Sequence, residues 1–161
     1  MNKTIFLDRD GVVNQERGEY TWKIEDFKLT IGLIEFLKIV IEKGYLVIII
    51  SNQGGVGKGL FTKEDVEKAH QYLTTELAKE NIRLTDIYYC PHHPNSGKCL
   101  CRKPQSLLLE KAIARYEVDV EKSYFIGDRP RDEESGANVG LKTILIESND
   151  HLCKYLSQIA D

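Results

Sequence analysis

Five short runs of apolar and β-branched residues are distributed along the chain, separated by longer and more polar segments. Runs of this length and composition predict β-strands. The most apolar of them should be buried on both faces, because the strands of a parallel sheet are covered on both sides. The predicted strands span Thr4–Leu7, Tyr45–Ile50, Asp86–Tyr89, Ser123–Ile126 and Lys142–Ile146.

Apolar residues recur at helical spacing between these runs. The segment Ile31–Lys43 shows the pattern most clearly and stops at Gly44, a residue that favours the end of a helix. Thr62 is predicted to cap a second helix that runs to about residue 80. Two more helices are predicted at Ser106–Tyr116 and Arg131–Val139.

Strands that alternate with helices pack as a mainly parallel sheet with helices on both faces. We therefore predict an α/β fold, with one Rossmann-like, three-layer α/β/α domain spanning residues 1–161. The first irregular segment, residues 10–30, is too short to hold a separate cap domain. Ligands of such folds bind at the carboxyl ends of the strands, so the motifs that follow strands are the candidates for a site.

The composition excludes several function classes. The 22 basic and 25 acidic residues nearly balance, so the chain lacks the basic surface that holds nucleic acid non-specifically. No stretch reaches the ~20 apolar residues of a membrane span, and the N-terminus leads directly into the first predicted strand rather than a signal peptide. We expect a cytoplasmic monomer that acts on a small molecule and has no nucleic-acid or membrane partner.

Two carboxylates follow the first predicted strand. Asp8 and Asp10 are two residues apart, so they point the same way, and Gly11 permits a sharp turn. Close carboxylates repel unless a cation neutralises them, and Mg²⁺ with its oxygen ligands does this well. The alternative is a solvated turn, in which Asp and Gly are ordinary residues.

The second predicted strand leads into Ser51 and a glycine-rich loop that can offer backbone N–H groups to an anion. Ser51 is the candidate phosphate ligand. A nucleotide-binding P-loop is excluded, because Asn52 stands where its leading glycine should be and no Ser or Thr follows Lys58. The alternative is a flexible turn.

Two cations and a further carboxylate follow later in the chain. Arg102 and Lys103 precede a helix at the Pro104 break, and Lys103 could neutralise charge on a phosphoryl group. Asp128 follows the fourth predicted strand and could complete a cation site. An exposed basic pair and a helix N-cap aspartate are the alternative interpretations.

These four motifs supply, in order, a nucleophile, a hydroxyl, an ammonium and a metal ligand, each at a strand end or a helix entry. They match the signature motifs of the haloacid dehalogenase (HAD) superfamily, which the chain resembles over residues 5–146. The resemblance implies a magnesium-dependent phosphatase that works through an aspartyl-phosphate. The matching residues are Asp8-x-Asp10-Gly11, Ser51, Lys103 and Gly127-Asp128.

The resemblance also implies a role for each residue. Asp8 would be the nucleophile and Asp10 the proton donor and acceptor. Ser51 and Lys103 would stabilise the phosphoryl oxygens. Arg9, between the two aspartates, is expected to point elsewhere. The implied Mg²⁺ ligands are Asp8, Asp10 through its backbone carbonyl, and Asp128.

Within the superfamily the chain looks most similar to the D-glycero-D-manno-heptose 1,7-bisphosphate phosphatases, through Leu7–Asn14, Ser51–Gln53 and Cys90–Pro94. Histidinol-phosphate phosphatases are the rival, because they share the short metal loop and because Arg129 replaces a lysine frequent in the heptose enzymes. A remote alternative is a phosphoryl-binding module without catalysis. The substrate contacts implied by the resemblance are Arg102, Asn52, Gln53 and Arg129.

Three of the four cysteines cluster beside two histidines. Together they offer the Cys₃His ligand set of a structural zinc site in one loop, about residues 90–101. The alternatives are a sterically awkward Cys99–Cys101 disulfide, a bridge from Cys90, and free thiols. The spacing leaves open whether His92 or His93 binds, and Cys153 is expected to be a core or surface thiol. The family resemblance implies the ligands Cys90, His92, Cys99 and Cys101.

Overall fold

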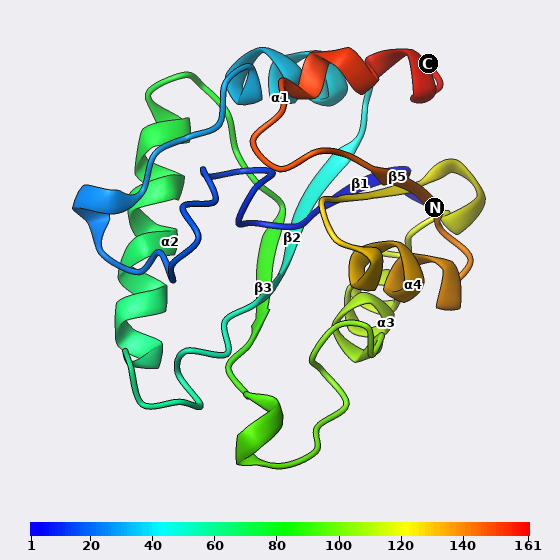
Figure 1. Ribbon diagram of the computed structural model, residues 1–161. Coiled ribbons are helices and arrows are strands. Elements are labelled where there is room, and N and C mark those ends of the chain that lie inside the picture. Colours follow the sequence, from blue (N-terminus) through cyan, green and yellow to red (C-terminus); the bar gives the residue numbers. More distant parts are fainter.

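The computed structural model describes residues 1–161, and a five-stranded parallel sheet forms its centre (Figure 1). All five predicted strands are present, in the order β3-β2-β1-β4-β5. Strand β2 ends two residues later than predicted, because Ser51 and Asn52 pair with the neighbouring strand. The strands are β1 (Thr4–Leu7), β2 (Leu46–Asn52), β3 (Asp86–Cys90), β4 (Tyr124–Gly127) and β5 (Lys142–Leu145).

Helices cover both faces of the sheet, which confirms the three-layer α/β/α prediction (Figure 1). Helices α1 and α2 pack on one face together with a 3₁₀ helix at Leu152–Gln158, and α3 packs on the other face beside α4. The 3₁₀ helix was not predicted, since it is short and irregular. No inserted cap domain interrupts the alternation. The helices are α1 (Leu33–Glu42), α2 (Lys63–Ala78), α3 (Leu107–Arg115) and α4 (Pro130–Asn138).

Apolar residues of the sheet and helices form one core on each face, a larger one of 22 buried residues and a smaller one of 10. Strand β1 lies between β2 and β4 and all four of its residues are fully buried, as predicted for a central parallel strand. The sheet therefore holds the residue that follows β1 in a rigid position.

Helix α2 begins where the sequence predicts. The Thr62 hydroxyl accepts a hydrogen bond from the Asp65 backbone N–H at 3.1 Å, and the Asp65 carboxylate accepts one from the Thr62 N–H at 2.9 Å. This capping box satisfies two donors that the helix itself leaves free. It fixes the start of the helix that later supplies His70.

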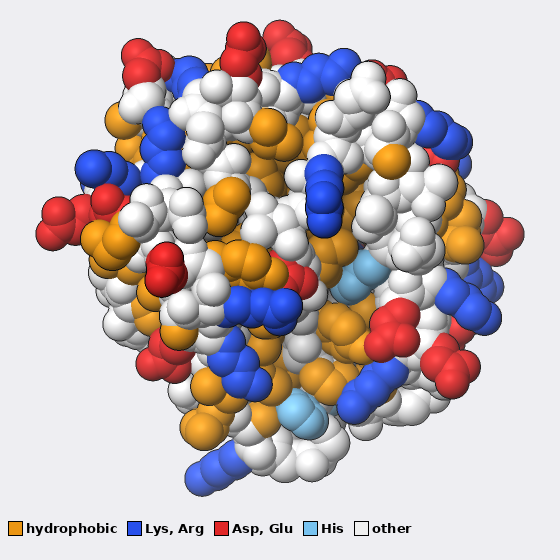
Figure 2. Space-filling model, turned by 180° about the vertical axis from the view of Figure 1, so that it is seen from behind, with side chains coloured by type: hydrophobic (Ala, Val, Ile, Leu, Met, Phe, Trp, Pro, Cys, Tyr) orange, Lys and Arg blue, Asp and Glu red, His pale blue; other side chains and the backbone are white.

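The surface shows no concentration of one charge on the face seen in Figure 2, where basic and acidic side chains are interspersed. This agrees with the formal net charge of −3. None of the helices combines the length and the apolar composition that crossing a membrane requires.

Candidate active site

Asp8 and Lys103 meet at the carboxyl edge of the sheet. Asp8 follows β1 and is 5% exposed, and the Lys103 ammonium lies 2.7 Å from its Oδ1 atom. The same ammonium lies 2.7 Å from Asp132 Oδ1 and donates to the Ile50 carbonyl at 2.9 Å. Burial alone would lower the Lys103 pKa, but the two carboxylates outweigh it and the pKa is raised. The ammonium is therefore held charged beside the Asp8 carboxylate.

Asp8, Asp128 and Asp132 form an acidic cluster in which one oxygen of each lies within 4.8 Å of the others. Burial, and then the negative charge of Asp8, raises the pKa of Asp128 to about 7. Asp128 Oδ1 is buried and has no hydrogen-bond partner in the protein. Crowded carboxylates with an unpaired buried oxygen are the donor set that suits a hard divalent cation. The residues therefore fit Mg²⁺, because one lysine, Lys103, balances only one of the three negative charges.

Two glycines make this crowding possible. Gly11 has a φ of +89°, and a Cβ atom there would lie 2.1 Å from Asp128 Oδ2. A Cβ atom on Gly127 would lie 2.2 Å from the Cβ of Asp132. Any larger residue at either position would push a carboxylate out of the cluster.

Asp10 faces a different set of neighbours. Its carboxylate is not part of the acidic cluster, whereas its backbone carbonyl accepts no hydrogen bond and stays free for a ligand. Asn14 donates to Asp10 Oδ1 at 2.9 Å, and Gln53 donates to Oδ2 at 2.9 Å. The Arg9 guanidinium also donates to Oδ1, at 2.8 Å. Arg9 stays out of the cavity, as expected, but the expectation missed that its long side chain folds back through the interior onto Asp10.

These three donors decide the charge of Asp10. Burial alone would raise its pKa, but the charge of Arg9 and the hydrogen bonds from Arg9, Asn14 and Gln53 lower it overall. The carboxylate form is stabilised and both of its oxygens are fixed in direction.

Ser51, Asn52 and Gln53 hold the site from the end of β2. Ser51 is fully buried, and its hydroxyl oxygen accepts a hydrogen bond from Gln53 Nε2 at 2.8 Å. The Asn52 side chain accepts from the Lys103 N–H at 2.9 Å and donates to the Lys103 carbonyl at 3.2 Å. Asn52 thus fixes the backbone of Lys103, 51 residues further along the chain.

An open cavity of about 380 Å³ lies above these residues. Of the predicted substrate contacts, Asn52 and Arg129 line it. Gln53 does not, since it is 1% exposed and bonded to Asp10, and Arg102 lies on the neighbouring loop, where it donates to the His92 carbonyl at 3.2 Å. The lining residues are Asp8, Asp10, Glu16, Gly18, Glu19, Tyr20, Asn52, Asp128, Arg129 and Arg131.

Two further residues of this site were missed from the sequence. Asp132 is 1% exposed and contacts Lys103, and its place four residues after Asp128 in the first turn of α4 was the available signal. Arg131 lines the cavity, and its Nε atom is buried without a hydrogen-bond partner. The sequence did not indicate this role, because the direction of the Arg131 side chain depends on how α4 packs in the fold.

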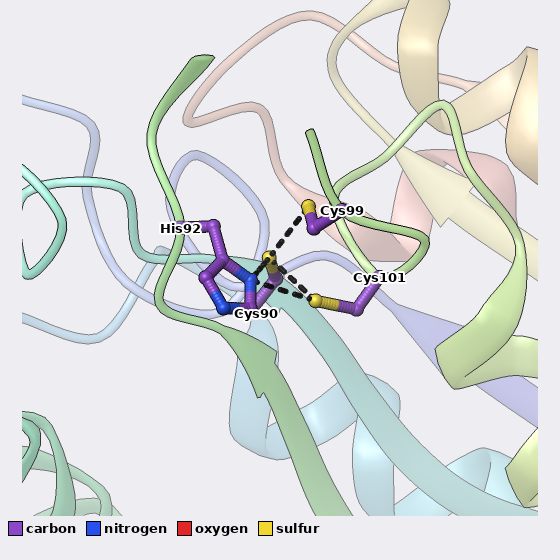
Figure 3. Close-up of side chains that lie close together, drawn as sticks. All are labelled: Cys90, His92, Cys99 and Cys101. Atoms are coloured by element: carbon purple, nitrogen blue, oxygen red, sulfur yellow. Dashed lines mark hydrogen bonds between the residues drawn. The ribbon is translucent and has the colours of Figure 1, made fainter. Parts of the chain in front are cut away.

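A second cluster, of cysteines and a histidine, lies in the loop after β3 (Figure 3). The Cys90 sulfur lies 3.8 Å from the Cys99 sulfur and 2.8 Å from the Cys101 sulfur. His92 Nδ1 lies 3.3 Å from the Cys90 sulfur and 3.2 Å from the Cys101 sulfur. In a tetrahedral site with Zn–S of ~2.3 Å and Zn–N of ~2.0–2.1 Å, ligand atoms lie roughly 3.5–3.8 Å apart. The four side chains converge closely enough to fit one zinc ion.

The structure brings His92 rather than His93 into this cluster. His93 Nδ1 accepts a hydrogen bond from the Asn95 N–H at 3.1 Å and caps a short 3₁₀ helix in the loop. Cys153 lies outside the cluster, half-buried near Gly32. The sequence left this choice of histidine to the family resemblance.

A family model described as HAD-hydrolase-like matches residues 100–159 of the chain. The chain is 36% identical over 148 residues to the D-glycero-alpha-D-manno-heptose-1,7-bisphosphate 7-phosphatase of Campylobacter jejuni, covering 92% of this chain and 84% of that protein. It is 37% identical over 169 residues to the D-glycero-beta-D-manno-heptose-1,7-bisphosphate 7-phosphatase of Helicobacter pylori, covering 99% and 96%.

Among solved structures, the chain is similar to the D,D-heptose 1,7-bisphosphate phosphatase from B. bronchiseptica in complex with magnesium and phosphate. The TM-score is 0.85 and the identity is 30%, and the superposition covers 97% of this chain and 86% of the other. The fold and the sequence therefore point to the same group of proteins.

Proposed function

Because this chain belongs to the HAD-like family of D-glycero-D-manno-heptose-1,7-bisphosphate 7-phosphatases, we propose that it removes the 7-phosphate from such a bisphosphate in a magnesium-dependent reaction. The observation that supports this most directly is the meeting of Asp8, Lys103 and the acidic cluster below one open cavity. Family membership favours this substrate over histidinol phosphate and leaves no support for a module without catalysis.

Asp8 is the nucleophile of the proposed reaction. One of its oxygens attacks the phosphorus while the bond between phosphorus and the sugar oxygen breaks, giving an aspartyl-phosphate. Asp10 rests as the carboxylate, so it first takes up a proton from the monoanionic phosphate ester or from solvent in the cavity and then gives it to the departing sugar oxygen. Asp10 then accepts a proton from the water that attacks the aspartyl-phosphate, and free phosphate leaves. Asp10 lines the cavity, as both proton transfers require.

The remaining residues stabilise charge. The Lys103 ammonium, 2.7 Å from Asp8, would neutralise a phosphoryl oxygen held at Asp8, and the Ser51 hydroxyl, at the end of β2, would donate to another. Asp8, Asp128 and the Asp10 carbonyl would hold Mg²⁺, with Asp132 bound to Lys103 behind them. The cation would offset the repulsion between the Asp8 carboxylate and the anionic substrate.

Zinc would hold the loop after β3. Cys90, His92, Cys99 and Cys101 provide four protein ligands, which leaves no open coordination position, so the ion is a scaffold without a catalytic role. Its structural effect reaches the active site, because Cys101 is followed by Arg102 and Lys103.

A second phosphate needs cations in addition to Lys103, and two arginines line the cavity. Arg129 and Arg131 line the cavity, and Arg102 lies on the neighbouring loop. A bisphosphate suits this distribution better than the single phosphate and the amine of histidinol phosphate.

The test compares initial rates on the two heptose 1,7-bisphosphate anomers, fructose 1,6-bisphosphate and histidinol phosphate with Mg²⁺ present. We expect the highest kcat/KM for a heptose bisphosphate and no turnover by Asp8→Asn, because the nucleophile is lost. A larger kcat/KM for histidinol phosphate would reject the substrate, and retained turnover by Asp8→Asn, protected from deamidation, would reject the mechanism.

A further inference from the structure

Arg9 is the largest fully buried side chain of the protein, with no exposed surface. Its Nη2 atom donates to Asp10 Oδ1 at 2.8 Å and to the Thr21 carbonyl at 2.6 Å. Its guanidinium carbon lies 5.3 Å from the centre of the Phe27 ring. The guanidinium is thus enclosed by protein, and its Nε atom has no hydrogen-bond partner. The interior is a costly place for a positive charge unless a partner compensates it.

Asp10 is the one carboxylate within ion-pair distance of Arg9. The pair is asymmetric, because the Arg9 side chain is fully buried whereas a quarter of the Asp10 side chain is exposed, on the cavity side. Arg9 cannot rotate away without leaving its charge unpaired in the interior. The geometry therefore fixes the direction of the Asp10 carboxylate from behind.

Helix α2 anchors the other end of the guanidinium. Arg9 Nη1 lies 3.3 Å from His70 Nε2. A guanidinium can only donate, so His70 Nε2 must be the acceptor, with its proton on Nδ1 and the ring neutral. Burial and the charge of Arg9 agree with this, because they lower the His70 pKa to about 3. Tyr89 of β3 packs edge-on against the His70 ring, with the ring centres 5.6 Å apart.

We propose that Arg9 is a positioning residue, held by His70 and the Thr21 carbonyl, that orients the Asp10 carboxyl group for proton transfer to the leaving oxygen. This rests on the proposed function, since it concerns the same reaction. Arg9 does not touch the substrate in this arrangement. Its effect on the reaction passes through Asp10. His70, which does not line the cavity, also takes part, because it holds Arg9 in place.

Comparing two leaving groups distinguishes positioning of Asp10 from a purely structural role of Arg9, because a structural defect would lower the rates on both esters equally. A sugar alkoxide must be protonated as it departs, whereas p-nitrophenolate is stable enough to leave without a proton. The ratio kcat/KM covers only the steps up to departure of the leaving group, so later hydrolysis of the aspartyl-phosphate does not enter. General acid catalysis is worth about 10²–10⁴ in rate.

The experiment measures kcat/KM for heptose 1,7-bisphosphate and for p-nitrophenyl phosphate with wild type, Arg9→Lys, His70→Leu and His70→Gln. For Arg9→Lys we expect a loss of about 10² on the sugar phosphate and under about 3-fold on the aryl phosphate. His70→Leu removes the hydrogen-bond acceptor of Arg9. It should lower kcat/KM for the sugar phosphate by about 10-fold and have little effect on the aryl phosphate. His70→Gln keeps an acceptor oxygen and should restore most of the activity.

A background variant tests whether the effect passes through Asp10. In Asp10→Asn, the further change Arg9→Lys should lower kcat/KM for the sugar phosphate by under about 2-fold, because coupled residues are not additive. If Arg9→Lys does not fold, as judged by circular dichroism, the two His70 variants decide. Equal losses on both esters, or full additivity with Asp10→Asn, would overturn the inference. A wild-type protein that hydrolyses neither ester would instead overturn the proposed function.

Discussion

Replacing Asp128 by Asn should stabilise the magnesium-free protein while removing its response to magnesium. Asp128 lies in the acidic cluster with Asp8 and Asp132, and its pKa is raised from 3.8 to about 7 by burial and by the charge of Asp8. A shift of this size corresponds to roughly 4 kcal/mol at ~1.36 kcal/mol for each pKa unit. Solvent at the cavity mouth screens part of the repulsion, so we expect about half, ~2 kcal/mol.

The sign of the pH dependence follows from the direction of the shift. Folded Asp128 holds its proton up to about pH 7, whereas unfolded Asp128 releases it near pH 3.8. The folded state therefore binds more protons between these values, and its stability falls as the pH rises through this window. The variant lacks this group, so its advantage over wild type should be near zero at pH 4 and largest above pH 7.

The assay is thermal unfolding of both proteins from pH 4 to pH 8 in magnesium-free buffer without chelator, so that the proposed zinc site is not stripped. For a chain of this size, ~2 kcal/mol corresponds to about 4–8 °C in Tm. Wild type should gain about 2.7 kcal/mol when Mg²⁺ is added at 100 times its Kd, and Asp128→Asn should gain almost nothing. A variant that is no more stable than wild type above pH 7 would refute the reasoning about charge repulsion.

Three further predictions concern other parts of the site. Gly11→Ala places a Cβ atom 2.1 Å from Asp128 Oδ2 and should raise the Mg²⁺ concentration needed for half-maximal activity by about 10-fold or more, and an unchanged magnesium titration would contradict this. Cys101→Ser should lose the bound zinc, about one ion per chain by elemental analysis, whereas the matched variant Cys153→Ser should keep it. Arg131→Met should raise KM for a heptose 1,7-bisphosphate by about 10-fold, with no change for heptose 7-phosphate, and an equal effect on both substrates would exclude a contact with the second phosphate.

The residues at the strand ends are the part of the site that the hydrophobic pattern of the sequence could predict. Short apolar runs alternating with helical periodicity predicted a parallel sheet, and a parallel sheet brings residues that follow its strands to one edge. Asp8 and Asp128 follow neighbouring strands, β1 and β4, and the structure places their carboxylates in one cluster. Pairing at the end of β2 was the part that local pattern missed, since it depends on β3.

The contacts made by side chains that lie in loops could not be predicted from the sequence pattern. Lys103 reaches Asp8 across 95 residues of chain, because the Asn52 side chain holds its backbone while Asp132 and the Ile50 carbonyl hold its ammonium. The sequence could not show whether the Gln53 amide contacts a substrate or supports Asp10. The structure shows that it is buried and donates to Asp10. Such long-range contacts have no periodic signature.

The sequence by itself determined the fold class, the order of the four motifs, the cysteine cluster and the carboxylates that end the strands, because these depend on local periodicity and on the chemistry of single residues. The tertiary structure alone decided that Arg9 turns inward to Asp10 and that His70 of α2 anchors it. These choices follow from burial: a charged or polar group in the interior must find a partner, and the packed elements determine which partners are within reach.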